Sequence, residues 1–199
     1  MMLIEETAIP DAALPVEVFK AHLRLGSGFA VDDVQDVVLG SFLRAALAAI
    51  EGRTGKVLLE RSFSTSVSAW RDSGAHVLPV APVNAVSGVE QVGRDGSRTD
   101  VAAGSWWLER HTDTPKLRAT GASLPAVPSG GSVVISFDAG FATDWDGVPS
   151  DLRQAVLMLA AHYYEYRHDT GLSNGCMPFG VSSLVERYRH LRIGAGAVK

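Results

Sequence analysis

Three ionisable side chains in the C-terminal quarter of the chain have the spacing of metal ligands. His162, Glu165 and His168 recur every three residues, so a helix would place them on one face. A Glu-x-x-His motif supplies ligands to the di-iron and di-manganese sites of helical bundles. Such a site also needs a second motif and two further glutamates from facing helices, and the sequence offers no such set. We therefore expect a solvated helix face, with a metal-dependent enzyme using these three residues as the alternative.

Other candidate sites are less complete. The segment Asp144–Trp145–Asp146–Gly147 resembles the start of a calcium loop, but its twelfth position is Ala155 where that loop needs glutamate, so we expect a turn. Cys176 is the only cysteine, which rules out an intramolecular disulfide and indicates an inert thiol. Gly194-x-Gly196 lacks the helix and lysine that follow a phosphate-binding loop. The sequence therefore predicts no catalytic, cofactor-binding or metal site.

Composition is typical of one folded, soluble unit. The chain has 199 residues, 46% of them hydrophobic, with a formal net charge of −4. A chain of this length can bury a substantial core. Its net negative charge argues against tight nucleic-acid binding, which needs clustered Lys and Arg. The sequence shows no secretory signal and no apolar stretch long enough to cross a bilayer. We expect a cytoplasmic protein with no membrane partner.

Helical patterns dominate the N-terminal third. Residues 1–14 lack a period and contain a proline, so we expect an irregular arm. Pro15 suits the first turn of a helix running to about residue 25, and Asp32 or Asp33 can cap a second helix that ends near Gly55. The apolar stripe of this second helix consists of Leu39, Phe42, Leu43, Ala46, Leu47 and Ile50. Gly40 interrupts it, and close packing against a neighbour would explain that glycine.

From about residue 57 to 142 the apolar period becomes alternating, which predicts a β-insertion of about five strands. Expected strands lie near residues 63–67, 86–92, 106–108, 115–117 and 132–137, and proline confines residues 77–83 to edge or connecting segments. Asp95–Gly96 predicts a hairpin turn. Trp106 and Trp107 should face opposite sides of a strand, one in the core and the other at an interface.

The last fifty residues read as a long helix between Pro149 and Gly171, a short helix from about 181 to 192, and a loose tail. The predicted fold class is α+β, with two helices at the N-terminal end, a long and a short helix at the C-terminal end, and an antiparallel β-subdomain inserted between them. The predicted organisation is an arm at 1–14, one domain at 15–192 with its β-insertion at about 57–142, and a flexible tail at 193–199.

Several short motifs follow one another along the chain: Thr54–Gly55–Lys56–Val57–Leu58, Leu78–Pro79–Val80–Ala81–Pro82–Val83, Asp138–Ala139–Gly140–Phe141, Val148–Pro149–Ser150–Asp151–Leu152, Ala161–His162–Tyr163–Tyr164–Glu165 and Pro178–Phe179–Gly180–Val181. Their order resembles that of the head–tail connector (adaptor) family of tailed phages and gene transfer agents. No single motif is specific, and their shared order over some 180 residues carries the resemblance. It does not distinguish an infectious phage from a gene transfer agent.

The resemblance implies a structural protein assembled in the bacterial cytoplasm and located in the neck of a virion or gene-transfer-agent particle. Members form a ring, here expected to be dodecameric, on the portal protein at the capsid vertex. The ring extends the channel through which DNA passes and presents a surface to the next neck or stopper protein. The portal interface would fall on the C-terminal helix and tail, at Arg187, Tyr188, Leu191, Arg192, Ile193, Val198 and Lys199.

Two other classes stay open at this point. A neck stopper or tail-completion protein would be mostly β-barrel, which the predicted helices at both ends argue against. A ligand-binding module would need a concave apolar pocket, and sequence alone does not reveal one.

Overall fold

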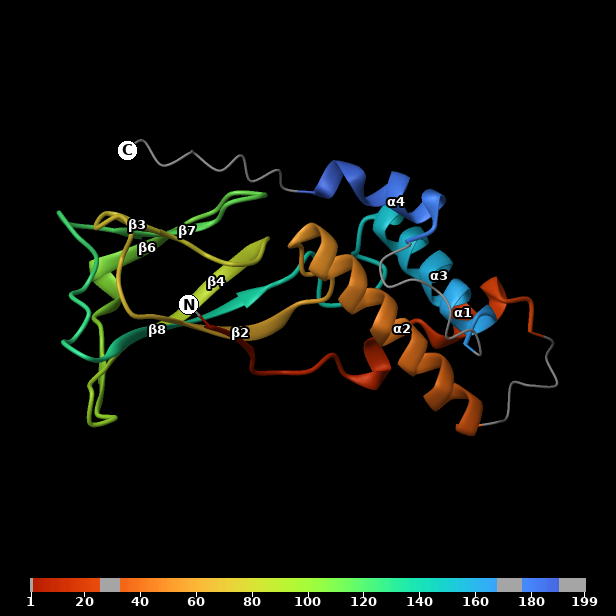
Figure 1. Cartoon of the computed structure of the whole chain (residues 1–199), viewed down its shortest axis with the longest axis horizontal. Coiled ribbons are helices and arrows are strands. Elements are labelled where there is room, and N and C mark those ends of the chain that lie inside the picture. The colour runs from red at the N-terminus through yellow and green to blue at the C-terminus, as the bar shows by residue number, and fades with distance from the viewer. Residues whose placement is uncertain (1, 26–32, 168–176, 190–199) are drawn as a thin grey trace.

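The computed structural model describes residues 2–25, 33–167 and 177–189. Along the long axis of the molecule, helices occupy one end and β-strands the other (Figure 1). The described part of the chain begins in the β end, crosses to the helices, returns through the central strands and has its last described elements, α4 and a 3-10 turn, at the helical end.

The helical end consists of α1 (Val16–His22), α2 (Asp33–Thr54), α3 (Ser150–Glu165) and α4 (Phe179–Val185). The predicted stripe of α2 is its buried face, and Leu39, Leu43 and Ile50 are all 0% exposed. This face packs on α3, whose Leu152, Val156 and Leu159 fill the other side of the same core. Ring edges reinforce the contact, because Phe42 meets Tyr164 at a centroid distance of 5.9 Å and an angle of 86°.

Five antiparallel strands form the larger sheet, in the order β1-β2-β8-β4-β5. Their bounds are Met2–Glu5, Arg61–Val67, Ser132–Ala139, Val83–Val92 and Arg98–Asp100 in that order. Central β8 alternates between buried and half-buried residues, with Val133, Ile135 and Phe137 directed into the core.

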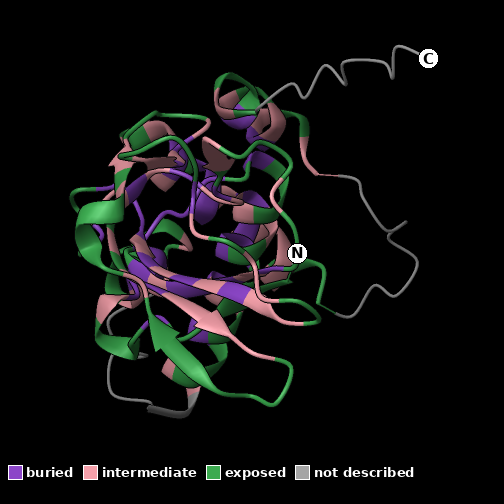
Figure 2. Cartoon of the chain, turned by 90° about the vertical axis from the view of Figure 1, so that its left-hand side faces the viewer, coloured by how far each residue is buried: buried purple, intermediate pink, exposed green. Residues whose placement is uncertain are grey.

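The smaller sheet has the order β3-β7-β6, formed by Ala75–Val77, Lys116–Ala119 and Trp106–Glu109. It covers one face of the larger sheet, and the two enclose a second apolar core that includes Phe63, Leu117 and Phe137. Seen from the β end, buried residues lie in the interior and exposed residues on the surrounding loops (Figure 2). Short 3-10 turns at Asp11–Ala13, Ala103–Ser105 and Glu186–Tyr188 complete the fold.

A buried ion pair joins the helical end to the β end. Arg61 opens β2 and is only 6% exposed. Its Nη2 donates to Glu51 Oε2 of α2 at 2.7 Å, and its Nε lies 3.0 Å from Glu5 Oε1 of β1. Glu51 Oε1 in turn accepts the main-chain N–H of Leu58 at 2.8 Å. The last turn of α2, a connecting segment and two strands are therefore fixed around one guanidinium.

The predicted α+β class is confirmed, with helices at both ends and an inserted antiparallel β-structure. Trp107 is 48% exposed while Trp106 packs against the β core, as predicted for opposite faces. The Asp95–Gly96 turn joins β4 to β5, with Gly96 at a φ of 82°. Gly40 was expected to need a close neighbour, but a methyl group there would meet Leu14 Cδ1 at an ordinary 3.7 Å.

Several boundaries were wrong. Residues 2–5, expected to be irregular, form β1, because β2 supplies hydrogen-bonding partners from sixty positions further along the chain. The described residues contain eight strands instead of about five, since β1, β3 and β5 are too short to show a period. Helix α3 ends at Glu165, before the predicted Gly171, which lies outside the described residues. The last helix ends at Val185, tightens to a 3-10 turn at Tyr188 and is extended at Arg189.

Among the described residues, no helix combines the length and apolar character that crossing a membrane requires.

Two glycine-to-alanine substitutions should have opposite effects on the free energy of unfolding. Gly52 lies in α2 with no atom within 4 Å of an added Cβ, so Gly52→Ala should stabilise the fold by up to about 1 kcal/mol through helix propensity. Gly140 has a φ of 151°, and its added Cβ would lie 2.4 Å from Glu60 Cα. We expect Gly140→Ala to destabilise by more than about 2 kcal/mol. Thermal unfolding checks both, and an equal fall in Tm for the two would contradict this account.

Candidate interaction site

The C-terminal segment was predicted to carry the interface, and the structure describes its first part. Helix α4 packs on α3 through Val181 and Val185, both 0% exposed. Gly180 permits this approach, because a Cβ there would lie 2.8 Å from Met158 Cε. Of the predicted interface residues, Arg187 and Tyr188 are described. Leu191, Arg192, Ile193, Val198 and Lys199 lie outside the described residues.

Tyr188 is tied to the start of α3. Its hydroxyl donates to Asp151, with Oδ1 at 2.8 Å and Oδ2 at 3.0 Å. Asp151 also accepts the main-chain N–H of Leu152 at 2.9 Å, in the first turn of α3, where a carboxylate is favoured by the helix dipole. The ring of Tyr188 meets Phe141 edge-on at 6.0 Å. Burial, followed by the bond to Asp151, raises the pKa of the Tyr188 phenol above its ordinary value.

Arg187 remains accessible although it is oriented by the same group. Its side chain is 73% exposed, its Nη1 lies 3.4 Å from Asp151 Oδ2, and its guanidinium stacks 4.9 Å from the Tyr188 ring. Arg189 extends the basic edge and pairs with Glu186 at 2.9 Å. The structure therefore assigns the two described residues different roles: Tyr188 positions the segment, and Arg187 presents charge to solvent.

The alternative metal site does not assemble among the described residues. His162 stacks against Tyr166 at 4.7 Å, while Glu165 is exposed. His168 lies outside the described part of the chain. Within that part, no cluster of three or more histidine, cysteine or acidic side chains could hold a metal ion. The Asp144 loop is a turn, in which Asp144 Oδ1 accepts the N–H of Gly147 at 2.9 Å.

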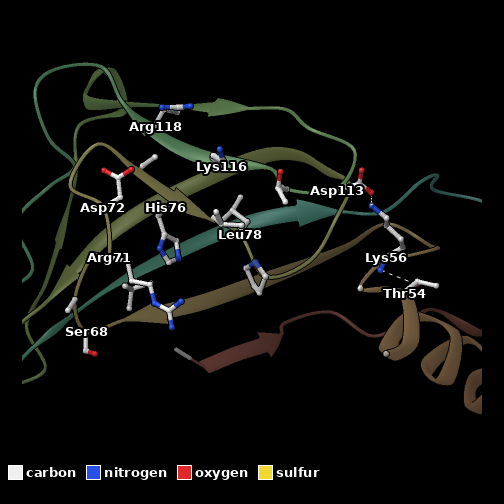
Figure 3. Close-up of a pocket in the computed structure, with 18 of the residues that line it drawn as sticks. Thr54, Lys56, Ser68, Arg71, Asp72, His76, Leu78, Asp113, Lys116 and Arg118 are labelled. Atoms are coloured by element: carbon white, nitrogen blue, oxygen red, sulfur yellow. Dashed lines mark hydrogen bonds and ion pairs between the residues drawn. The ribbon is translucent and has the colours of Figure 1, made fainter. Parts of the chain in front are cut away.

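A cavity that sequence reasoning missed opens beside the smaller sheet (Figure 3). It has a volume of about 850 Å³ and lies between the end of α2, the end of β2, strand β3 and strand β7. Lys56, only 2% exposed, forms its inner wall and donates from Nζ to Thr112 O and, at 2.6 Å, to Asp113 Oδ1. The sequence indicates a helix end and a family motif at Thr54–Gly55–Lys56, but nothing in the local sequence signals that this lysine is buried.

His76 points into the same cavity from β3 (Figure 3). Burial, and then the positive charge of Arg71, lower the pKa of its imidazole. The Trp70 ring contacts it at 5.2 Å, and its Nε2 is buried without a hydrogen-bond partner in the described structure. Both effects favour the neutral form of this imidazole.

Solved structures similar to this chain come from gene transfer agent (GTA) particles. A chain from the neck of the empty GTA particle, computed with C6 symmetry, matches with a TM-score of 0.89 and 49% identity, covering 98% of this chain and 99% of that one. A chain from the neck of the native GTA particle, computed with C12 symmetry, gives 0.85 and 47% over the same shares. A chain from the virion of the native GTA particle gives 0.87 and 50%, again over 98% and 99%. Neither a protein-family model nor a curated protein matches.

Tyr188→Phe should lower the free energy of unfolding by about 1–2 kcal/mol, because it removes a hydrogen bond to a carboxylate that is partly exposed. The wild-type contribution is present below the ordinary phenol pKa of 10.0, because the folded-state pKa is raised, and is lost as pH rises through that higher value. Denaturant unfolding between pH 7 and 11 should therefore show the difference between the two proteins shrinking above about pH 10. A constant difference would contradict the Tyr188–Asp151 linkage.

Proposed function

The chain belongs to the family of head–tail connector proteins found in the neck of gene transfer agent particles, and from this premise we propose that it forms a ring on the portal. The ring would extend the DNA channel and dock the next neck protein. The observation that carries the proposal is sequence identity of 47–50% over 98% of the chain to components of such particles. The protein is thus a structural virion component of the neck, and we infer that it has no catalytic role.

Ring formation is supported by the symmetry of the related particles. Their necks are computed with C6 and C12 symmetry, and the C12 symmetry supports a ring of twelve subunits. A closed cyclic ring uses heterologous contacts, so each subunit presents two different surfaces to its two neighbours. The free edges of this fold provide such a pair, since β1 and β5 lie at opposite ends of the larger sheet.

We propose the C-terminal segment as the portal anchor, at Arg187, Tyr188, Leu191, Arg192, Ile193, Val198 and Lys199. Contacts of Tyr188 to Asp151 and Phe141 support this, because they fix the point from which the remaining residues depart. Ordering a residue costs roughly 1–2 kcal/mol of backbone entropy. Burial of Ile193 and Val198 would return on the order of 1.5–3 kcal/mol each, so charge contacts from Arg187, Arg192 and Lys199 are needed to complete the anchor.

Deleting residues 193–199 should abolish attachment to the portal and leave Tm unchanged, because the two cores of the described part of the chain are formed by other residues. Co-purification of the truncated protein with portal-bearing heads measures attachment. A full-length control with Ala195→Ser and Ala197→Ser keeps both apolar anchors and should attach as wild type does. Normal portal occupancy of the truncated protein would place the anchor elsewhere.

Free protein at micromolar concentration should scatter light as a monomer of 21.1 kDa. The reason is that its large exposed apolar residues are distributed over separate elements, including Met2 on β1, Val37 on α2 and Phe179 on α4. A standard stable interface buries about 800 Å² per partner, and apolar residues scattered over separate elements do not form one such surface. Purified portal should convert the monomer to a ring, and a concentration-independent ring without portal would contradict the expectation.

A further inference from the structure

Strand β3 has one free edge. It pairs only with β7, through bonds that include Ala119 N–H to Gly74 O at 3.0 Å and Leu78 N–H to Pro115 O at 2.9 Å. Main-chain groups of an antiparallel strand point to alternate sides at successive residues. Ala75 and Val77 therefore direct their N–H and C=O groups away from β7. In the described structure no main-chain hydrogen bond reaches them from that side.

The free edge borders the cavity described above, which is basic although the chain as a whole is acidic. The cavity lining has an excess of three positive charges, whereas the whole chain has a net charge of −4. The five cationic side chains are Arg53, Lys56, Arg71, Lys116 and Arg118, and the two carboxylates are Asp72 and Asp113. Lys56 pairs with Asp113, and Arg118 pairs with Glu109. Arg53, Arg71 and Lys116 have no ion-pair partner within the described residues.

Val77 at this edge is 46% exposed, on a strand whose outward main-chain groups are open. An extended peptide satisfies both the strand edge and the unpaired cations, because its main chain adds a strand to the sheet edge and its carboxylates meet the cations. Nucleic acid would use the cations but not the strand edge.

The described strands of this chain do not supply such a peptide to a neighbouring copy. On β5, Arg98 and Asp100 share one face and carry opposite charges, so this strand offers no net negative charge to Arg71 and Lys116. On β1, Glu5 is already paired with Arg61. A second copy therefore matches the cavity poorly, and a different protein is the better partner.

We propose that the free edge of β3 and its cavity bind an extended, carboxylate-bearing strand of a different protein of the neck. This inference rests on the proposed function and assigns to it a second docking surface, separate from the C-terminal portal anchor.

The test uses Val77→Pro in assembled particles. Proline removes an N–H that the fold itself does not use, and proline is tolerated on edge strands where the N–H faces outward. Val77→Ala is the matched control, because it trims the side chain and keeps the N–H. Arg71→Glu with Lys116→Glu tests the charges without altering the backbone, with Arg94→Glu in the β4–β5 turn as its control. Tm of each purified variant verifies folding.

Two quantities are measured in purified particles: the ratio of this chain to portal, and the fraction of heads that carry a tail. Val77→Pro and the double charge reversal should leave the ratio of this chain to portal unchanged. Both should lower the tailed fraction at least about tenfold, and each control should keep that fraction within about twofold of the wild-type value. Loss of portal attachment would appear in the first ratio, so a failure of the proposed anchor is distinguishable from a failure of this inference. An unchanged tailed fraction, or loss of the chain from the portal in Val77→Pro, would overturn it.

A photocrosslinker placed at position 77 identifies the partner. The expected product is a peptide from a different neck protein, with acidic residues at alternate positions. Crosslinking to a second copy of this chain, to DNA, or to a segment without carboxylates would contradict the proposal. A crosslinker at Thr99, on the β5 edge of the larger sheet, is the positional control and should not capture that peptide.

Discussion

The buried guanidinium of Arg61 is the constraint on which the two ends of the molecule depend. A charge that is removed from water must be paired closely. Among the described residues, the carboxylates within ion-pair distance of Arg61 are those of Glu51 on α2 and Glu5 on β1. Because these ion pairs span the junction between helices and strands, they fix the β end to α2 together with main-chain bonds from Val57 and Glu60. Removing Arg61 would leave the carboxylates of Glu51 and Glu5 without this partner where the chain crosses between the two cores.

Much of this fold could be predicted from local sequence. Proline at positions 15 and 149 precedes α1 and α3 as predicted, and the stripe of α2 is buried where its period indicates. What escaped prediction depends on distant partners. Strand β1 is exposed on every residue and exists because β2 pairs with it, and the last helix stops where Tyr188 reaches an aspartate 37 positions earlier.

The candidate site was predictable to a smaller extent for the same reason. Arg187 and Tyr188 could be selected because they precede a tail with no reason to fold alone, but sequence could not assign Tyr188 its bond to Asp151. The cavity beside β3 was not predictable, since its unpaired cations come from α2, the β2–β3 connection and β7. Residues at positions 53, 71 and 116 show no pattern until the sheets bring them together.

The two proposed docking surfaces lie on different cores, which lets one small protein connect two partners. The C-terminal segment is held by α3 in the helical core, and β3 borders the β core. Close-packed protein interiors have low compressibility, so the two cores do not deform gradually. The junction around Arg61 therefore keeps the two surfaces at a fixed relative position. A ring built from such subunits would hold portal and neck partner at a fixed separation around the channel. The edge of β3 is already formed in the described structure, so this chain would need no rearrangement of that edge to dock the strand.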